Sequence, residues 1–373
     1  MIAIQKEIQK CLQNGSNGVI GTIISTEGST YQKTGAKCFI HEDGKITGLL
    51  SGGCVEGDLK EYAFQILESG IPKIVEYDFQ DEGDLVWGLG LGCNGKMDIF
   101  LEPFLPKRGN ERAVSINAYY KAALTKPMHC ITIIESAEQS LVGTKWMIDP
   151  DSEEFPEIEN KDILIDYLHQ RETLKNGRSM IGEKCELQVF YECTTPPPQL
   201  MIFGAGPDAV PIVRMAKSLN WQVTVLDYRP AFATEENFPD VDRLLIYPAG
   251  TAPEIELNRN SYVILMTHNF LQDQLILEQI FTKDAAYIGL LGPRKRTNEL
   301  IKTSMGLKMN TEIDNIHSPI GLDIGSKTPE EIALSIIAEI MLVYRGGTGS
   351  KLSDVKSHPL VETRSGCEVV WNT

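Results

Sequence analysis

Two cysteines in the first hundred residues lie in glycine-rich segments, a placement that suits thiol chemistry. Cys54 lies in residues 51–57, where a strand is expected to turn into a helix, and Cys93 lies in residues 90–95. Amides at a helix N-terminus stabilise a thiolate and lower the pKa of the thiol, and glycine lets a ligand approach the backbone. Although a single cysteine is usually a small buried hydrophobe, two in glycine turns favour binding of a soft metal or sulfur chemistry.

A second glycine-rich segment, Gly-Ala-Gly-Pro-Asp-Ala at residues 204–209, lies between an expected strand and an expected helix. In a dinucleotide-binding turn the first glycine, here Gly204, makes the tight bend. The second, Gly206, lets the backbone approach a pyrophosphate, and a small residue such as Ala209 permits close helix packing. The sequence therefore predicts that Gly204, Ala205 and Gly206 hold a phosphate-bearing ligand.

Two aspartates near this turn support opposite interpretations of its function. Asp227 ends the next strand, about where an acid that binds a ribose hydroxyl is expected. Asp208 is discordant, because a carboxylate that faced the turn would repel a phosphate. The alternative is a Rossmann fold whose ligand site is vacant or rebuilt.

Two further loops follow expected strands of the same sheet, and open α/β sheets bind ligands at that edge. Thr267 and His268 end one strand, and Gly292 and Arg294 open a basic segment that leads into a helix. A helix N-terminus with cationic side chains attracts anions. We predict that Thr267, Gly292 and Arg294 bind the ligand and that His268 is a catalytic candidate, the alternatives being a solvated basic cluster and a structural imidazole.

The elements that position these loops follow from residue pattern. Between residues 199 and 345, short apolar strands alternate with helices, which is typical of a parallel sheet covered on both faces. The expected strands there are residues 200–203, 222–227, 243–246, 262–266 and 286–291. The preceding residues mix helices with hairpin-like strands. The predicted fold class is α/β, a C-terminal Rossmann-type parallel sheet with an N-terminal α+β domain.

Composition changes suggest the domain boundaries. We expect an N-terminal cysteine-bearing domain (1–105), a connecting α+β segment packed on it (106–193), a proline-rich linker (194–198), a Rossmann-type domain (199–345) and a tail (346–373). Three consecutive prolines favour an extended, stiff linker. No long-period repeat is evident.

Net charge and cysteine usage exclude several classes of protein. A formal net charge of −16 argues against nucleic-acid and anionic-membrane partners. The sequence has no apolar run long enough to span a bilayer and no signal-peptide pattern at its start, so we expect a cytoplasmic protein with reduced cysteines. The eight cysteines form no Cys-x-x-Cys pair, so a structural zinc or an iron–sulfur centre is not expected.

Several motifs in fixed order resemble the XdhC/CoxI family of maturation factors for molybdenum-cofactor enzymes such as xanthine dehydrogenase. The matching segments are residues 28–30, 35–37, 52–56, 92–95, 197–198, 204–206, 267–268 with Asp273, 289–292 and 317–325. The resemblance runs from Val19 to about Tyr344 and is weakest between residues 105 and 185. Where family members often have His-Val after the Gly-x-Gly, this chain has Pro207 and Asp208.

The resemblance implies a protein that binds molybdenum cofactor (molybdopterin, or a dinucleotide form of it). Such a protein guards the cofactor during sulfuration by a cysteine desulfurase and passes it to an apo xanthine dehydrogenase-type molybdoenzyme. It implies Cys54 as the contact to molybdenum or its sulfur, with Cys93 nearby and Gly52, Gly53 and Glu56 as binding residues. The Rossmann turn and Arg294 would hold a phosphate, so both halves would contact one molecule.

Two other functions remain open. Asp227 suits the ribose of NAD, so an NAD(P)-binding oxidoreductase or an accessory subunit of xanthine dehydrogenase is the first alternative. A redox-sensing Rossmann protein that binds a nucleotide is the second. A homodimer is expected only because two-fold assemblies are common.

Overall fold

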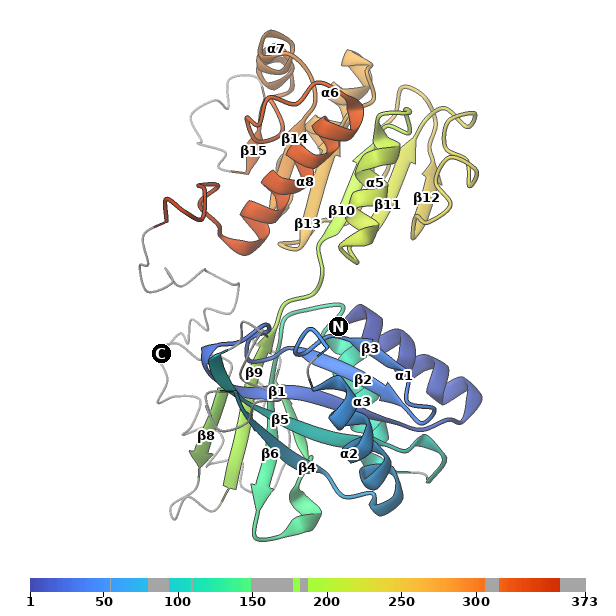
Figure 1. The fold of residues 1–373 in the computed structure, drawn as a ribbon. Coiled ribbons are helices and arrows are strands. Elements are labelled where there is room, and N and C mark those ends of the chain that lie inside the picture. Colours follow the sequence, from blue (N-terminus) through green and yellow to red (C-terminus); the bar gives the residue numbers. More distant parts are fainter. Residues whose placement is uncertain are drawn as a thin grey trace, which may run out of the picture. The chain divides into compact units, whose positions relative to one another are not determined.

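The computed structural model describes residues 1–53, 55–79, 94–108, 110–148, 177–181, 187–305 and 315–355. The chain divides into two compact units, one built on Met1–Pro196 (unit 1) and one that starts at Pro197 (unit 2), each shown in Figure 1. Among the described residues, no helix has both the length and the apolar character needed to cross a membrane.

Unit 2 is built on a sheet in which all neighbouring strands run parallel. Its strands are β10 (Gln199–Phe203), β11 (Gln222–Asp227), β12 (Arg243–Ile246), β13 (Ser261–Leu265), β14 (Tyr287–Leu290) and β15 (Ile316–His317). They lie in the order β12-β11-β10-β13-β14-β15. Strands β10 to β12 extend the sheet to one side and β13 to β15 extend it to the other, so the topological switch point lies between β10 and β13. In such sheets the ligand crevice opens at the carboxyl ends of the two strands at that switch point.

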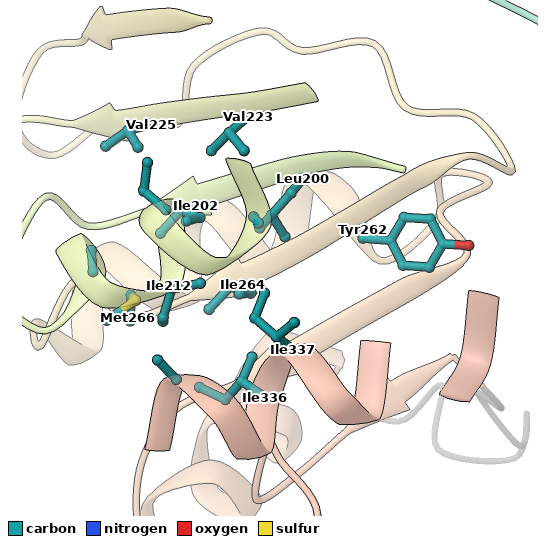
Figure 2. Close-up of a cluster of buried hydrophobic side chains, with 14 of the residues drawn as sticks. Leu200, Ile202, Ile212, Val223, Val225, Tyr262, Ile264, Met266, Ile336 and Ile337 are labelled. Carbon is teal, nitrogen blue, oxygen red and sulfur yellow. The ribbon is translucent and has the colours of Figure 1, made fainter. Parts of the chain in front are cut away.

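Helices cover both faces of this sheet. They are α5 (Ala209–Ser218), α6 (Phe270–Ile280), α7 (Arg294–Met305) and α8 (Pro329–Arg345). Helices α5 and α8 pack on one face through the cluster in Figure 2, where Ile212, Ile336 and Ile337 meet strand residues such as Ile202 and Ile264. Helices α6 and α7 pack on the other face.

Helix α8 begins with a reciprocal capping box. The Thr328 hydroxyl accepts a hydrogen bond from the Glu331 amide at 3.2 Å, and the Glu331 carboxylate accepts one from the Thr328 amide at 2.9 Å. Pro329 occupies the first turn, where a missing N–H costs no hydrogen bond.

Unit 1 contains two antiparallel sheets, ordered β3-β2-β1-β5-β4 and β7-β6-β9-β8. The first comprises β1 (Gly18–Ser29), β2 (Lys37–His41), β3 (Ile46–Gly48), β4 (Lys73–Asp78) and β5 (Asn94–Phe104). The second comprises β6 (Met128–Ser136), β7 (Lys145–Ile148), β8 (Gly177–Ile181) and β9 (Leu187–Thr194). Its described α-helices are α1 (Ile2–Asn14), α2 (Glu56–Ser69) and α3 (Glu111–Ala122).

The core of unit 1 joins these sheets. Helix α2 covers the first sheet through Leu59, Ala63 and Ile66. Helices α1 and α3 share a second cluster with residues of both sheets, such as Phe39 and Cys130. Antiparallel strands can pack one face on a core while the other is less buried, which explains the alternating burial of β7.

The predicted fold class is confirmed, with a parallel Rossmann-type sheet preceded by an α+β part. Two details differ from expectation. Helix α1 had no counterpart among the predicted elements. Cys193 is disulfide-bonded, so the expectation of uniformly reduced cysteines is wrong for this residue, whereas Cys11, Cys38 and Cys130 are free and buried.

Candidate functional site

The glycine-rich turn of unit 2 lies at the carboxyl end of β10, against the end of β13. Gly204 has a φ of +124°, and a Cβ on it would lie 2.3 Å from the Met266 carbonyl oxygen. Its amide donates to the Leu226 carbonyl at 2.8 Å. Only glycine can make this approach, because both the backbone conformation and the space exclude a side chain.

Asp227 braces this turn. Its Oδ2 accepts a hydrogen bond from the Ala205 amide at 2.6 Å and one from Arg229 Nη2 at 2.8 Å. Its Oδ1 accepts from the Arg229 amide at 2.8 Å and from Arg229 Nε at 3.0 Å. Burial alone would raise the pKa of Asp227, but these hydrogen bonds outweigh it and hold the pKa below its ordinary value.

The consequence is that Asp227 has no free acceptor for a ribose hydroxyl. A carboxylate offers about four lone-pair sites, and all four are in use on a residue with 0% exposure. The spacing that predicts a ribose-binding acid here also fits an acid that fixes the turn. Arg229, 29% exposed in its side chain and stacked over Phe232 at 4.2 Å, is the group that faces solvent beside it.

Asp208 and His268 form a hydrogen-bonded pair beside the same turn. Asp208 Oδ2 lies 2.8 Å from His268 Nε2, and Asp208 Oδ1 lies 2.5 Å from where a Cβ of Gly206 would be. His268 has a φ of +58°, the left-handed region that non-glycine residues rarely adopt. The carboxylate thus lies over Gly206 at the start of α5, where a dinucleotide-binding turn would accept phosphate.

His268 therefore contacts a carboxylate, and its catalytic role stays a prediction. Its side chain is 58% exposed and that of Asp208 is 30% exposed, so the pair is open to solvent.

A buried network follows β13. Thr267 donates its hydroxyl hydrogen bond to Asp273 Oδ1 at 2.6 Å, and Asp273 Oδ2 accepts from Arg296 Nη2 at 2.7 Å. Thr267 and Asp273 are almost fully buried. Thr267 is thus committed to internal hydrogen bonds, and Arg296 is held in place by the buried carboxylate of α6.

The basic loop after β14 divides into two parts. Gly292 packs against Arg296, and Arg294 begins α7 as an exposed residue. Arg296 points back to the sheet edge, so it is better placed than Arg294 to face a ligand there. The sequence indicated a basic cluster but not which arginine the buried aspartate would fix.

Tyr247, which follows β12, is another residue that sequence reasoning missed. Its side chain is buried, and its hydroxyl has no hydrogen-bond partner among the described residues. Burial, with the nearby carboxylates of Asp227 and Asp273, raises the pKa of this hydroxyl. A neutral phenol therefore lies beside both aspartate–arginine pairs.

In unit 1, Glu56 organises the turn that precedes α2. Its Oε1 accepts from the amides of Leu50 (3.2 Å) and Ser51 (3.0 Å), and its Oε2 accepts from the Gly53 amide at 2.9 Å and from the Ser51 hydroxyl. Burial would raise the pKa of Glu56, but the hydrogen bonds from Ser51 and Leu50 lower it overall. Glu56 is therefore saturated and acts on the shape of the turn.

Three glycine-containing segments of unit 1, those around Gly28, Gly52 and Gly95, come together near the end of β1. Gly28 pairs with Gly95 across β1 and β5. The Tyr31 ring, in the next loop, lies 3.4 Å from where a Cβ of Gly52 would be. Cys54 and Cys93 lie outside the described residues, but Gly53 and Asn94, next to them in sequence, belong to these converging loops.

The buried cysteines of unit 1 differ in character from the predicted reactive pair. Burial raises the pKa of both the Cys38 thiol and the Cys130 thiol to about 12. These thiols are protonated at neutral pH and function as small apolar groups. Among the described residues, no group of three or more His, Cys, Asp or Glu side chains is arranged to hold a metal ion.

Comparisons with known proteins identify relatives of this chain. Residues 200–340 match the XdhC Rossmann domain, and residues 11–78 match the XdhC and CoxI family. The chain is 32% identical over 332 residues to a probable subunit of xanthine dehydrogenase from Bacillus subtilis (strain 168), covering 88% of this chain and 94% of that one. It is 22% identical over 335 residues to the molybdenum cofactor insertion chaperone PaoD of Escherichia coli (strain K12), covering 90% and 86%.

A solved structure shows the same fold. The crystal structure of a protein from Bacillus halodurans, described as a xanthine dehydrogenase, superposes with a TM-score of 0.72 at 30% identity, covering 95% of this chain and 98% of that chain. With a relative of 32% identity aligned over almost its whole length, and with both family domains in place, the resemblance seen in the motifs is confirmed. This chain belongs to the XdhC/CoxI family.

Proposed function

We propose that this protein binds molybdenum cofactor and delivers it to a xanthine dehydrogenase-type molybdoenzyme. The observation that carries the proposal is the convergence of three glycine loops around β1, beside the sequence neighbours of Cys54 and Cys93. The kinship with a molybdenum cofactor insertion chaperone supports it. On this view the protein is a maturation chaperone, and sulfuration by a cysteine desulfurase belongs to the same proposal.

The residues of unit 1 suit such a ligand. A Cβ at Gly53 would meet nothing within 4 Å, so the backbone beside Cys54 is open to an approaching group. Glu56 holds the amides of Leu50, Ser51 and Gly53 in fixed positions. We propose Cys54 as the contact to molybdenum or its sulfur and Glu56 as the residue that positions the turn.

The residues of unit 2 suit a phosphate group held by arginine. Arg229 and Arg296 are each fixed by a buried aspartate and remain about a quarter exposed in their side chains, at 29% and 26%. A guanidinium held in one orientation is a strong partner for phosphate oxygens. When bound, the cofactor supplies the molybdenum–pterin chemistry of its client enzyme. The protein's own groups bind and orient it.

The NAD(P) alternative loses the observation that favoured it. Asp227 was its main support, and this carboxylate already accepts four hydrogen bonds. An NAD ribose would have to displace the Ala205 amide or Arg229. Because Arg229 could still face a 2′-phosphate, NADP is kept as one outcome of the test.

The test is to identify what co-purifies with the protein. We would purify it from cells that make molybdenum cofactor and from matched cells that cannot, denature it, and assay oxidised pterin fluorescence, molybdenum and NAD(P). Pterin and molybdenum from the first cells only would support the proposal. NAD(P) without pterin, together with hydride transfer, would establish the alternative.

A substitution then locates the thiol contact. Cys54→Ala should lose pterin and molybdenum while the circular dichroism spectrum stays unchanged, and Cys38→Ala, at a buried thiol, is the matched control. Retention by Cys54→Ala at the level of the unchanged protein would refute the role of this cysteine. That both units contact one molecule stays a prediction.

A further inference from the structure

Two lysine–glutamate ion pairs lie buried between the two sheets of unit 1. Lys37 Nζ (β2) lies 2.9 Å from Glu192 Oε2 (β9), and Lys145 Nζ (β7) lies 2.9 Å from Glu102 Oε1 (β5). All four side chains are at most 6% exposed. The pairs are crossed, because each joins the lysine of one sheet to the glutamate of the other.

The two lysines have the same local partner. Each donates a 3.2 Å hydrogen bond to a threonine on the neighbouring strand of its own sheet, Lys37 to Thr22 and Lys145 to Thr132. In both sheets this threonine pairs directly with the lysine on one side and with a phenylalanine on the other, Phe100 or Phe190. The glutamate lies two residues after that phenylalanine.

The backbones around these residues also correspond. The order β2-β1-β5-β4 in the first sheet repeats as β7-β6-β9-β8 in the second, with every neighbouring pair antiparallel. Helix α1 precedes β1, as α3 precedes β6. The register shift in the long central pair falls just after Ile23 in one sheet and just after Ile133 in the other.

The turns that return the chain to the lysine strand match as well. Gly35 donates its amide to the Ile23 carbonyl at 2.8 Å, and Gly143 donates its amide to the Ile133 carbonyl at 2.8 Å. In sequence the correspondence is limited to three short patterns: Thr-Ile-Ile at 22–24 and 132–134, Gly-x-Lys at 35–37 and 143–145, and Phe-x-Glu at 100–102 and 190–192.

Equivalent residues of the two sheets meet each other in the core. Ile24, Phe100, Ile134 and Phe190 belong to one buried cluster. In a two-fold contact, residue i of one copy touches residue j of the other, and j touches i. The crossed ion pairs and this shared cluster are that pattern within a single chain.

We infer that unit 1 is an internal duplication, two copies of one helix–strand unit (residues 2–104 and 111–194) packed about a local two-fold axis. This inference differs from the sequence analysis, which found no evident long-period repeat. Few positions are identical, because the pattern is retained only where a buried charge or a tight turn requires a particular residue.

The copies differ in the loops that could bind a ligand. The connection between β4 and β5 is residues 79–93 in the first copy, whereas the one between β8 and β9 is residues 182–186. Residues 149–176, which follow β7, contain no glycine and no cysteine, whereas the segment after β2 holds Gly52, Gly53 and Cys54. Resting on the proposed function, we assign the ligand loops to the first copy alone and a scaffold role to the second.

The crossed pairing is tested with double substitutions of identical chemistry. Lys37→Met with Glu192→Leu removes one complete ion pair, and Lys145→Met with Glu102→Leu removes the other. Lys37→Met with Glu102→Leu removes one partner of each pair, so Lys145 and Glu192 each lose their contact partner and interact with each other only at longer range. Replacing a whole buried pair by apolar groups is often tolerated, whereas leaving single charges is strongly destabilising.

Urea unfolding of the full chain gives the readout, followed by tryptophan fluorescence in a Trp221→Phe background, which removes the tryptophan of unit 2 and keeps Trp146 of unit 1. The two complete-pair variants should behave alike. The half-pair variant should have an unfolding equilibrium constant shifted by about a hundredfold or more beyond theirs, or should fail to fold where they fold. Equal behaviour of all three variants, including failure of all three to fold, would overturn the two-fold arrangement.

The assignment of the ligand loops to the first copy has a separate readout, the molar ratio of molybdenum to chain in protein purified with cofactor. We expect one molybdenum per chain. Glu56→Gln should lose this molybdenum, and Glu138→Gln, at an exposed residue of the second copy, should keep it. A ratio near two, or loss in Glu138→Gln, would contradict the assignment. Absence of cofactor from the unchanged protein would refute the proposed function and leave the unfolding result to decide the duplication.

Discussion

Replacing Asp208 should strengthen the binding of phosphate-bearing ligands to unit 2. The Asp208 carboxylate lies over Gly206 at the start of α5, paired with His268 at 2.8 Å. A phosphate that approached the amides there would meet a negative charge at close range. Asp208→Asn keeps the size of the side chain and removes that charge.

The magnitude follows from Coulomb's law. At about 5 Å, and at an effective dielectric constant of about 60 for a partly exposed site, two unit charges interact by about 1 kcal/mol. A pyrophosphate group with two charges would be repelled by about 2 kcal/mol, and the His268 partner and salt screening offset part of this. We expect a gain of about 1 kcal/mol, which is roughly a fivefold lower dissociation constant.

Isothermal titration calorimetry with ADP, at low and moderate salt, measures this gain. Asp240→Asn, at an exposed acid of the same unit, controls for the change in net charge and should leave the dissociation constant unchanged. His268→Gln should weaken ADP binding, because it removes a group that can neutralise the carboxylate. Unchanged or weaker binding in Asp208→Asn would refute the view that this carboxylate opposes phosphate at the turn.

Three further predictions concern stability and can be checked by urea unfolding of unit 2. Gly204→Ala should cost roughly 3 kcal/mol or more, because the new Cβ would lie 2.3 Å from the Met266 carbonyl oxygen. Gly347→Ala, at an exposed glycine where a Cβ would meet nothing within 4 Å, should be mild. A small effect at Gly204 would contradict the packing described. Thr328→Ala should lower the free energy of unfolding by about 1 kcal/mol, because it removes the capping box. Thr303→Ala, in α7, should lower it less. Equal losses of stability in the two variants would argue against the cap. Arg229→Met should lower the free energy of unfolding by roughly 3 kcal/mol at neutral pH and weaken its fall toward acid pH. The pKa of Asp227 is lowered in the fold, so its contribution to stability is complete above the unfolded value near 4 and is lost as pH falls through the folded pKa. An unaltered dependence of stability on acid pH would count against this pairing.

The Rossmann unit was predictable because its signals are local. Short apolar runs such as Leu200–Phe203 end at turn residues and alternate with helices, and that pattern alone fixes a parallel sheet. The glycine pattern at residues 204–209 is equally local and was readable from the chain, whereas the contacts of the turn with Leu226, Asp227 and Met266 were not.

The roles of individual side chains were less predictable, because they depend on contacts between distant segments. Asp227 had the spacing of a ribose-binding acid, but sequence could not show that its carboxylate meets the Ala205 amide. Likewise, the segment around Arg294 was recognisably basic, while only the fold shows that Asp273 fixes Arg296. The duplication in unit 1 escaped notice for a related reason, since a two-fold contact constrains a few buried positions and leaves the rest free to diverge.

The brace between Asp227 and the Ala205 amide has a kinetic consequence for any ligand of unit 2. With this hydrogen bond and the Gly204 contact in place, the turn needs no ordering when a ligand arrives, so little conformational entropy is lost there. Association should then be fast and only weakly dependent on temperature, and differences between related ligands should appear in how slowly each one leaves.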